Sequence, residues 1–385
     1  MQAPPRPKQL NRLMASAEFV EQPPAGFNYT YWFTCPDCAG RINTTTLEEP
    51  VTCACGAEND TADLNPVLRD PNDVALRDDL VASLIWYHTS RYENWPDRQA
   101  YAAETADMVA EGFSYLDEAA QQQIIEQRTS FALHLGTYEA AIENMLRRLS
   151  DQDPVDRSTV RYWLHRVHIH LAPNDLHPHV GDEIPSYFGE VPLSELDERG
   201  ARAVRYVNIH EAHGSVSLAI HPDVIATVAS IALPLQSLAP ETPAAADATT
   251  AAAAALSELE QSRPDTTGID RICLRFRPML DARYPDPHDP ERQRIATIAD
   301  QLDDYENRHS AIWSNLTNTL EAEYLPHING NVRERFHHAL RHTDDPAEYH
   351  RDFQALAALL TRPTDVLAEL DTAPVRTLRT TDHNQ

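Results

Sequence analysis

Four of the five cysteines of this chain stand between positions 35 and 55. Cys35 and Cys38 form a CPDC knuckle, and Cys53 and Cys55 form a CAC knuckle that is followed by a glycine. Two thiolate pairs brought together by a hairpin supply the four soft ligands of a closed tetrahedral zinc site. The pattern predicts a zinc ribbon over residues 27–62, with a structural zinc because no coordination position stays open.

The competing interpretation is two disulfides in a secreted domain. It needs an export signal, and the N-terminus "MQAPPRPKQL" lacks the apolar core of one. No segment approaches the roughly 18 uninterrupted apolar residues of a membrane span. We therefore expect zinc, a soluble cytoplasmic protein and no membrane partner. A ribbon of this kind can also bind nucleic acid or a protein partner.

The charge balance restricts the possible partners. The 385 residues include 59 acidic and 32 basic side chains, which gives a net charge of −27. A surface of this sign argues against a protein that coats nucleic acid over its whole area, and it leaves room only for a local basic groove. A chain of this length is also expected to form two or three domains.

Composition shifts along the chain predict an α+β protein in several parts. Cys273 is expected to be a buried thiol in a strand over 271–277, because Ile272, Leu274 and Phe276 alternate around it. The predicted order is a flexible Pro-rich arm (1–26), the ribbon (27–62), a mixed domain (74–236), an Ala/Pro/Thr-rich linker or partly helical spacer (237–268) and a mostly helical region (269–385).

Polar side chains end the apolar strands of the mixed domain. The stretch "LIWYHTS", residues 84–90, ends on His88, Thr89 and Ser90, and a helix-like stretch follows over 97–127. A second strand over 131–135 turns His134 to the face opposite its apolar neighbours, and Thr137 is the predicted N-cap of a helix that continues to 149. This arrangement is suited to holding a polar ligand in a cleft.

A third element places a carboxylate beside a turn. The strand expected over 205–209 leads to Glu211, a turn follows at His213 and Gly214, and a second strand begins near Val216. A carboxylate at a turn is commonly just solvated. Polar and aromatic neighbours on otherwise apolar strands favour a role for Glu211 here, namely Tyr206, Asn208, Ser215 and Ser217.

The run "HRVHIHLAPNDLHPHVGDE" suggests a second metal site. His168 and His170 share one face of a strand, with His177, His179 and Asp182 close behind. The run lacks the spacing of a metal-ligand motif, so a polar strand and loop is the preferred interpretation.

Residues 80–236 resemble the ADP-ribosyltransferase and poly(ADP-ribose) polymerase superfamily. "YHTS" is similar to its His-Gly-Thr strand, "LHLGTYEAA" is similar to its second core strand, and Glu211 is then similar to its acidic residue. The resemblance implies a split β-sheet with helices, NAD as a substrate and an acceptor that is a protein or a nucleic acid.

The resemblance also implies a role for each residue. His88 would bind the adenosine ribose, the backbone of Thr89 would bind the nicotinamide carboxamide, and His134 would stack on nicotinamide. Glu211 would hold the nicotinamide ribose and stabilise the oxocarbenium ion that forms as nicotinamide leaves. Ser90 and Tyr206 complete the implied NAD-binding set.

The implied activity is NAD-dependent mono-ADP-ribosyl transfer with release of nicotinamide. Three alternatives stay open at the level of sequence. Another acid could replace Glu211, with Asp182, Glu183 and Glu190 as candidates. The protein could be a non-catalytic zinc-ribbon module that binds nucleic acid or protein. It could also be an RNA 2′-phosphotransferase, for which the local cations are Arg147, Arg148, Arg161 and Arg166. The oligomeric state is not indicated.

Overall fold

The computed structural model describes residues 19–151, 161–172, 174–182, 191–235, 238, 241–341 and 343–378. Most of the predicted N-terminal arm lies outside these ranges. The chain divides into two compact units. The first unit takes in the described residues up to Leu238, His327–Leu340 and the described residues from Ala358. The second unit takes in the described residues of Ala239–Pro326 and Arg341–Ala357.

The cysteine-containing segment is built from short strands. A three-stranded sheet has the order β2-β1-β5, and a separate hairpin pairs β3 with β4. The burial of β1 alternates, so Tyr31 and Phe33 face inward while the residues between them are more exposed. The strands are β1 (Tyr31–Thr34), β2 (Arg41–Thr44), β3 (Val51–Thr52), β4 (Glu58–Asn59) and β5 (Asn65–Pro66).

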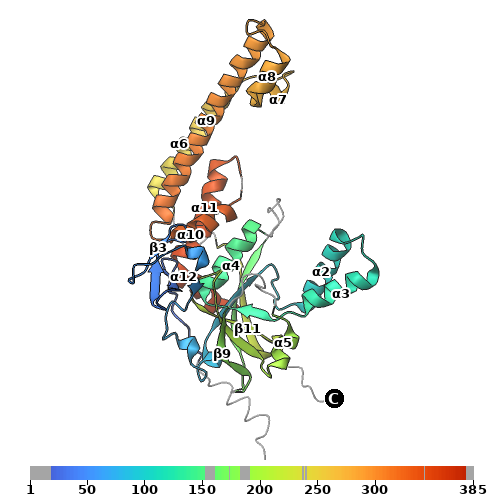
Figure 1. The fold of residues 1–385 in the computed structure, drawn as a ribbon, viewed down its shortest axis with the longest axis vertical. Coiled ribbons are helices and arrows are strands. Elements are labelled where there is room, and N and C mark those ends of the chain that lie inside the picture. The colour runs from blue at the N-terminus through green and yellow to red at the C-terminus, as the bar shows by residue number, and fades with distance from the viewer. Residues whose placement is uncertain are drawn as a thin grey trace, which may run out of the picture. The chain divides into compact units, whose positions relative to one another are not determined.

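Two four-stranded sheets form the body of the first unit (Figure 1). Their orders are β7-β11-β10-β9 and β13-β12-β8-β6, and all pairings are antiparallel except β9 with β10. The strands are β6 (Trp86–Ser90), β7 (Leu133–Leu135), β8 (Tyr162–Ile169), β9 (Leu176–Asp182), β10 (Ala203–Val207), β11 (Val216–Ile220), β12 (Ile225–Leu233) and β13 (Val375–Thr377).

One backbone bridge connects the two sheets. Tyr87 of β6 and Gly136, just after β7, exchange hydrogen bonds of 2.9 and 3.0 Å between their backbone N and O atoms. A Cβ atom at position 136 would lie 2.7 Å from the Cβ of Ala140 and 3.1 Å from Oγ of Ser217, so only glycine fits there. The bridge brings the ends of β6 and β7 together.

The helices of the first unit include one that lies against the sheets and a hairpin that extends from them. Helix α4 contacts β6, whereas α2 and α3 pack mainly on each other and project away from the sheets (Figure 1). Asp97 and Asp117 accept hydrogen bonds at the N-termini of α2 and α3. These helices are α2 (Arg98–Gly112), α3 (Glu118–Thr129), α4 (Tyr138–Asp151), α5 (Leu193–Glu198), α10 (Gly330–Ala339) and α12 (Pro363–Thr372).

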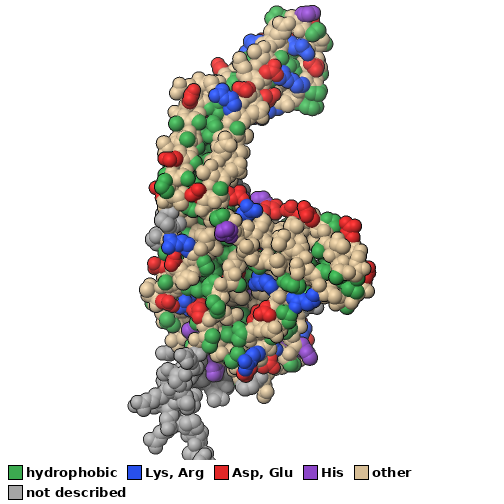
Figure 2. All heavy atoms as spheres, turned by 90° about the vertical axis from the view of Figure 1, so that its left-hand side faces the viewer, with side chains coloured by type: hydrophobic (Ala, Val, Ile, Leu, Met, Phe, Trp, Pro, Cys, Tyr) green, Lys and Arg blue, Asp and Glu red, His purple; other side chains and the backbone are tan. Residues whose placement is uncertain are grey.

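The second unit is helical in the residues that the structure describes. Helix α9, 35 residues long, packs along α6, and α7 and α8 lie near one end of it (Figure 1). Its helices are α6 (Pro243–Glu260), α7 (Arg271–Arg275), α8 (Arg277–Arg283), α9 (Pro290–Tyr324) and the first part of α11 (Pro346–Thr361). Figure 2 shows hydrophobic and charged side chains mixed over the face of this unit that is turned to the viewer.

Two sequence predictions fall in this unit. The prediction of a strand over 271–277 is wrong, because residues 271–275 form a helix that Asp270 caps by accepting from the Ile272 amide. Cys273 and Leu274 of this helix are buried. The segment 237–268, expected to be a linker or a partly helical spacer, contains helix α6. Alanine favours helix, and Ala245, Ala252 and Leu259 are buried.

The combination of mixed sheets and helices is the predicted α+β class. No helix within the described ranges is long and apolar enough to cross a membrane.

Candidate functional site

The four cysteines come together as the sequence predicts. The Sγ atoms of Cys35 and Cys55 are 3.8 Å apart, those of Cys38 and Cys53 are 3.6 Å apart, and all four lie within 4.8 Å of one another. Four sulfurs at about 2.3 Å from a tetrahedral zinc are separated by about 3.8 Å. No disulfide joins these cysteines. The geometry is therefore that of a site that could hold one metal ion.

The strand that leads into this cluster packs against the loop that carries Glu211. The rings of Tyr31 and Phe33 lie 5.1 and 5.4 Å from the ring of His213. The backbone N–H of Arg69 donates to the carbonyl of Gly214 over 2.8 Å. The ribbon and the loop 208–215 thus form one packed contact within the first unit.

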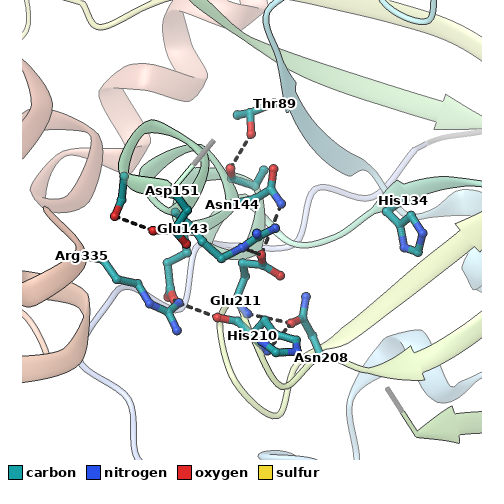
Figure 3. A network of polar contacts seen from close by, with 12 residues as sticks. Thr89, His134, Glu143, Asn144, Asp151, Asn208, His210, Glu211 and Arg335 are labelled. Atoms are coloured by element: carbon teal, nitrogen blue, oxygen red, sulfur yellow. Dashed lines mark hydrogen bonds and ion pairs between the residues drawn. The ribbon is translucent and has the colours of Figure 1, made fainter. Parts of the chain in front are cut away.

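Glu211 is buried in a polar network between that loop and helix α4 (Figure 3). Its Oε1 accepts from Nε of Arg147 at 2.7 Å and from Nδ2 of Asn144 at 3.3 Å. Its backbone N–H donates to Oδ1 of Asn208 at 2.8 Å. The carboxylate is held in one position with a cation beside it.

A second buried carboxylate, that of Glu143 on helix α4, anchors the same loop. Glu143 accepts from the Tyr29 hydroxyl at 2.6 Å and from Arg335 at 2.9 Å, and Arg335 also donates to the carbonyl of His210. Burial raises the pKa of Glu143, and the Arg335 guanidinium opposes that rise. Glu143 thus links the ribbon, α4 and α10 to the segment that carries Glu211.

The residues at the end of β6 have separate tasks. Nδ1 of His88 donates to the backbone carbonyl of His134 over 2.8 Å, which leaves Nε2 of the neutral ring as an acceptor. Burial lowers the pKa of His88 to about 3, and Arg148 adds to that shift, so the ring is neutral near pH 7. The Thr89 hydroxyl donates to the carbonyl of Ala141 at 2.7 Å and so ties β6 to α4.

Ser90 belongs to a buried pair that the sequence did not indicate. Its Oγ lies 2.9 Å from Nε2 of His165, whose Nδ1 lies 2.8 Å from Oγ of Ser230. Both nitrogens of the His165 imidazole are therefore engaged inside the sheet.

His134 of β7 and Tyr206 of β10 lie close together in the sheet β7-β11-β10-β9, where both strands pair with β11. Nδ1 of His134 is 2.9 Å from the Tyr206 hydroxyl, and the two rings meet edge to face at 5.6 Å. In Figure 3 His134 lies on its own strand, to one side of the Glu211 network.

A small cavity joins most of the predicted residues. It has a volume of about 50 Å³, and we call it the Glu211 cavity. His88, Thr89, His134, Tyr206 and Glu211 line it, whereas Ser90 does not. The lining also includes residues that the sequence did not assign to the site, namely Asn144, Gly136, Asn208 and Ser217. The cavity is small, so part of a dinucleotide would lie outside it.

Some of these residues left a partial signal in the sequence. Asn144 and Arg147 stand three positions apart on α4, a spacing that puts both on one helix face. Nothing local shows that this face meets Glu211, since 64 residues separate Arg147 from it.

The histidine-rich run does not form a second metal cluster in the described part of the chain, where the four cysteines are the group close enough to share an ion. Nδ1 of His168 is 2.9 Å from the Thr227 hydroxyl, and its ring stacks on Phe19 at 4.0 Å. The alternative acids Glu183 and Glu190 lie outside the described residues.

No protein-family model, no curated protein and no solved structure matches this chain.

Proposed function

We propose that the protein is an NAD-dependent mono-ADP-ribosyltransferase whose reaction centre is the Glu211 cavity. One observation carries the proposal: His88 of β6, His134 of β7 and Glu211 of the loop before β11 line the same cavity. Three separate segments of the chain supply the polar groups in the order that the family resemblance implies.

The reaction breaks the bond between the nicotinamide nitrogen and C1′ of the ribose. The electron pair of this bond leaves with nicotinamide, C1′ becomes electron-deficient, and a lone pair of the acceptor forms the new bond as the acceptor loses a proton. A fixed carboxylate in a site with little water stabilises the positive charge on the ribose. Glu211 has the position and the burial for this task.

The neighbouring groups fit the same ligand. Nε2 of His88 would accept from a ribose hydroxyl, because Nδ1 is engaged with His134. Arg147 donates to Oε1 of Glu211, so a ribose hydroxyl would donate to Oε2 or share Oε1 with Arg147. Ala140, Ala141 and Asn144 of α4 line the same cavity and would lie beside the bound ligand.

For the cysteine cluster we propose one structural zinc. Thiolates and the observed sulfur separations suit zinc, and four protein ligands leave no position for chemistry. The zinc would stabilise the ribbon, which packs on the loop of Glu211.

Titration calorimetry with NAD and a nicotinamide-release assay test the transferase. We expect NAD binding and slow release in the wild type, and loss of release by about 100-fold or more in Glu211→Gln with binding largely retained. Glu139→Gln is the matched control, because Glu139 is an equally buried carboxylate of α4 that accepts from Gly26 and does not line the cavity.

No NAD binding at millimolar concentration would refute the transferase and favour a zinc-ribbon module that binds nucleic acid or protein. Turnover of a 2′-phosphorylated RNA oligonucleotide that requires NAD would favour the phosphotransferase.

The zinc proposal predicts one zinc per chain by atomic emission. Cys38→Ser should lose the metal and lower the melting temperature, whereas Cys273→Ser, which changes the buried cysteine of α7, should keep it. Equal metal content in the two variants would contradict the assignment.

A further inference from the structure

A second and larger cavity lies on the other side of His88. Its volume is about 200 Å³, and we call it the Trp95 cavity. His88 lines both cavities, so they share one wall. The ring of Trp95 is buried, and it stacks on the ring of His88 with 4.4 Å between centroids. Tyr92 and Tyr101 provide further aromatic wall. These surfaces suit a flat ring.

Three arginines surround the same cavity, namely Arg98, Arg128 and Arg148. Arg98 donates to the carbonyl of Thr129, and Arg128 contacts the sulfur of Met108. Within the described residues none of the three forms an ion pair, although the chain as a whole carries a net charge of −27. The cavity is thus a local cationic site in an acidic protein.

Arg148 is the most informative of the three. It is half-buried, and its Nε atom is buried without a hydrogen-bond partner among the residues described. A buried donor of a charged group that lacks a hydrogen-bond partner destabilises the folded protein. A bound anion would remove that destabilisation.

The cavity also contains one carboxylate, and it is already occupied. Asp97 accepts from the backbone N–H of Ala100 at 2.9 Å and so caps helix α2. It lies at the cavity without an ion pair to any of the three arginines in the described part of the structure. The balance of charge therefore favours a ligand that is anionic.

We infer that the Trp95 cavity binds a nucleoside phosphate, with the base against Trp95 and its aromatic neighbours and the phosphates at the three arginines. Aromatic stacking and bidentate arginine contacts are the interactions that recognise the two ends of such a ligand. The volume suffices for a base, and the phosphates would lie toward the mouth, where Arg98 is exposed.

Two sources can supply this chemistry, a free nucleotide and the ADP part of NAD. The second source connects the inference with the proposed function, since His88 separates the Trp95 cavity from the Glu211 cavity. The inference itself rests on the aromatic walls and the arginines, and it does not need the transfer reaction.

Calorimetry of the full chain with ADP, adenosine and NAD tests it. We expect ADP to bind, adenosine to bind more weakly by tenfold or more, and the affinity for ADP to fall with added salt. Arg148→Gln should lower the affinity for ADP by at least tenfold. Arg199→Gln is the matched control: it removes one positive charge at the C-cap of α5, outside the cavity.

Trp95→Phe provides a second variant that keeps an aromatic wall. This variant should lower the affinity for ADP less than Arg148→Gln does. It should also alter the quenching of tryptophan fluorescence by ADP. Absence of ADP binding, or ADP affinity that Arg148→Gln leaves unchanged in a folded protein, would overturn the inference.

The two proposals fail separately. ADP binding that depends on Arg148, without any release of nicotinamide, would leave the nucleotide site and refute the transferase. Nicotinamide release that Arg148→Gln does not affect, without ADP binding, would leave the transferase and refute this cavity as a nucleotide site.

Discussion

His213 shows how one side chain connects the ribbon with the loop of Glu211. The ring is buried against Tyr31 and Phe33. Burial lowers the pKa of His213 from 6.5 to about 4, and the guanidinium groups of Arg335 and Arg69 add to the shift. The neutral ring is therefore the form that fits this contact.

The pH dependence of stability follows from that shift. Between pH 6.5 and about 4 the unfolded chain binds a proton on this histidine and the folded protein does not. The contribution is fully present above pH 6.5, and the free energy of unfolding falls by about 1.4 kcal/mol per pH unit as the pH drops to about 4. Urea unfolding at several pH values measures it.

The variant His213→Phe should flatten this part of the profile relative to the wild type. His179→Gln, which changes an exposed residue of β9, is the control and should leave the slope unchanged. Parallel profiles for the wild type and His213→Phe would contradict the buried neutral ring.

At the scale of elements, the loop between β10 and β11 has a shape that glycine permits. Gly214 has φ of +81°, and a Cβ there would lie 3.0 Å from both the carbonyl oxygen of Val67 and the amide nitrogen of Arg69. The close approach allows the hydrogen bond from Arg69 to Gly214 that joins the ribbon segment to the loop. Loop geometry and ribbon packing depend on the same residue.

Gly214→Ala should therefore cost more than the left-handed conformation alone, which is about 1–2 kcal/mol. Gly200→Ala is the matched control, since Gly200 has φ of +64° and open space at its Cβ position. Chemical denaturation should give Gly214→Ala a free energy of unfolding about 1 kcal/mol lower than that of Gly200→Ala. NAD affinity should fall only in the first variant. Equal losses in both would indicate that the ribbon does not restrain the loop.

At the scale of the molecule, charge repulsion opposes the compact state. The net charge is −27, and several ion pairs are exposed, such as Arg77 with Asp79 and Arg294 with Glu291. Exposed pairs of this kind contribute little to stability, because water and salt screen them. Repulsion among the surplus carboxylates extends over the whole surface at low salt.

Potassium chloride should therefore raise the melting temperature as the screening length falls from about 10 Å at 0.1 M to about 3 Å at 1 M. Differential scanning fluorimetry measures the shift, and the same series with a neutral osmolyte separates screening from solute exclusion. A melting temperature that falls with salt would mean that the ion pairs outweigh the repulsion.

Local spacing determined the parts that the sequence predicted. The cysteine knuckles, the strand that contains His88, the N-cap at Thr137 and the turn at Gly214 each depend on residues a few positions apart. Contacts over a few residues are encoded by side-chain type and backbone preference, which a sequence displays directly. The sequence also placed His88, His134 and Glu211 in one predicted domain, but it gave no distances between their side chains.

Tertiary structure decided what these residues touch. Residues 271–275 form a helix that packs on α8 and α9, although their alternating apolar residues favoured a strand. Arg147 reaches Glu211 across 64 positions, and Arg335 reaches Glu143 across 192. The burial that lowers the pKa of His88, and the three arginines around Trp95, come from segments that meet only in the folded chain. Such long-range contacts depend on the packing of whole elements, for which neither periodicity nor spacing carries a signal.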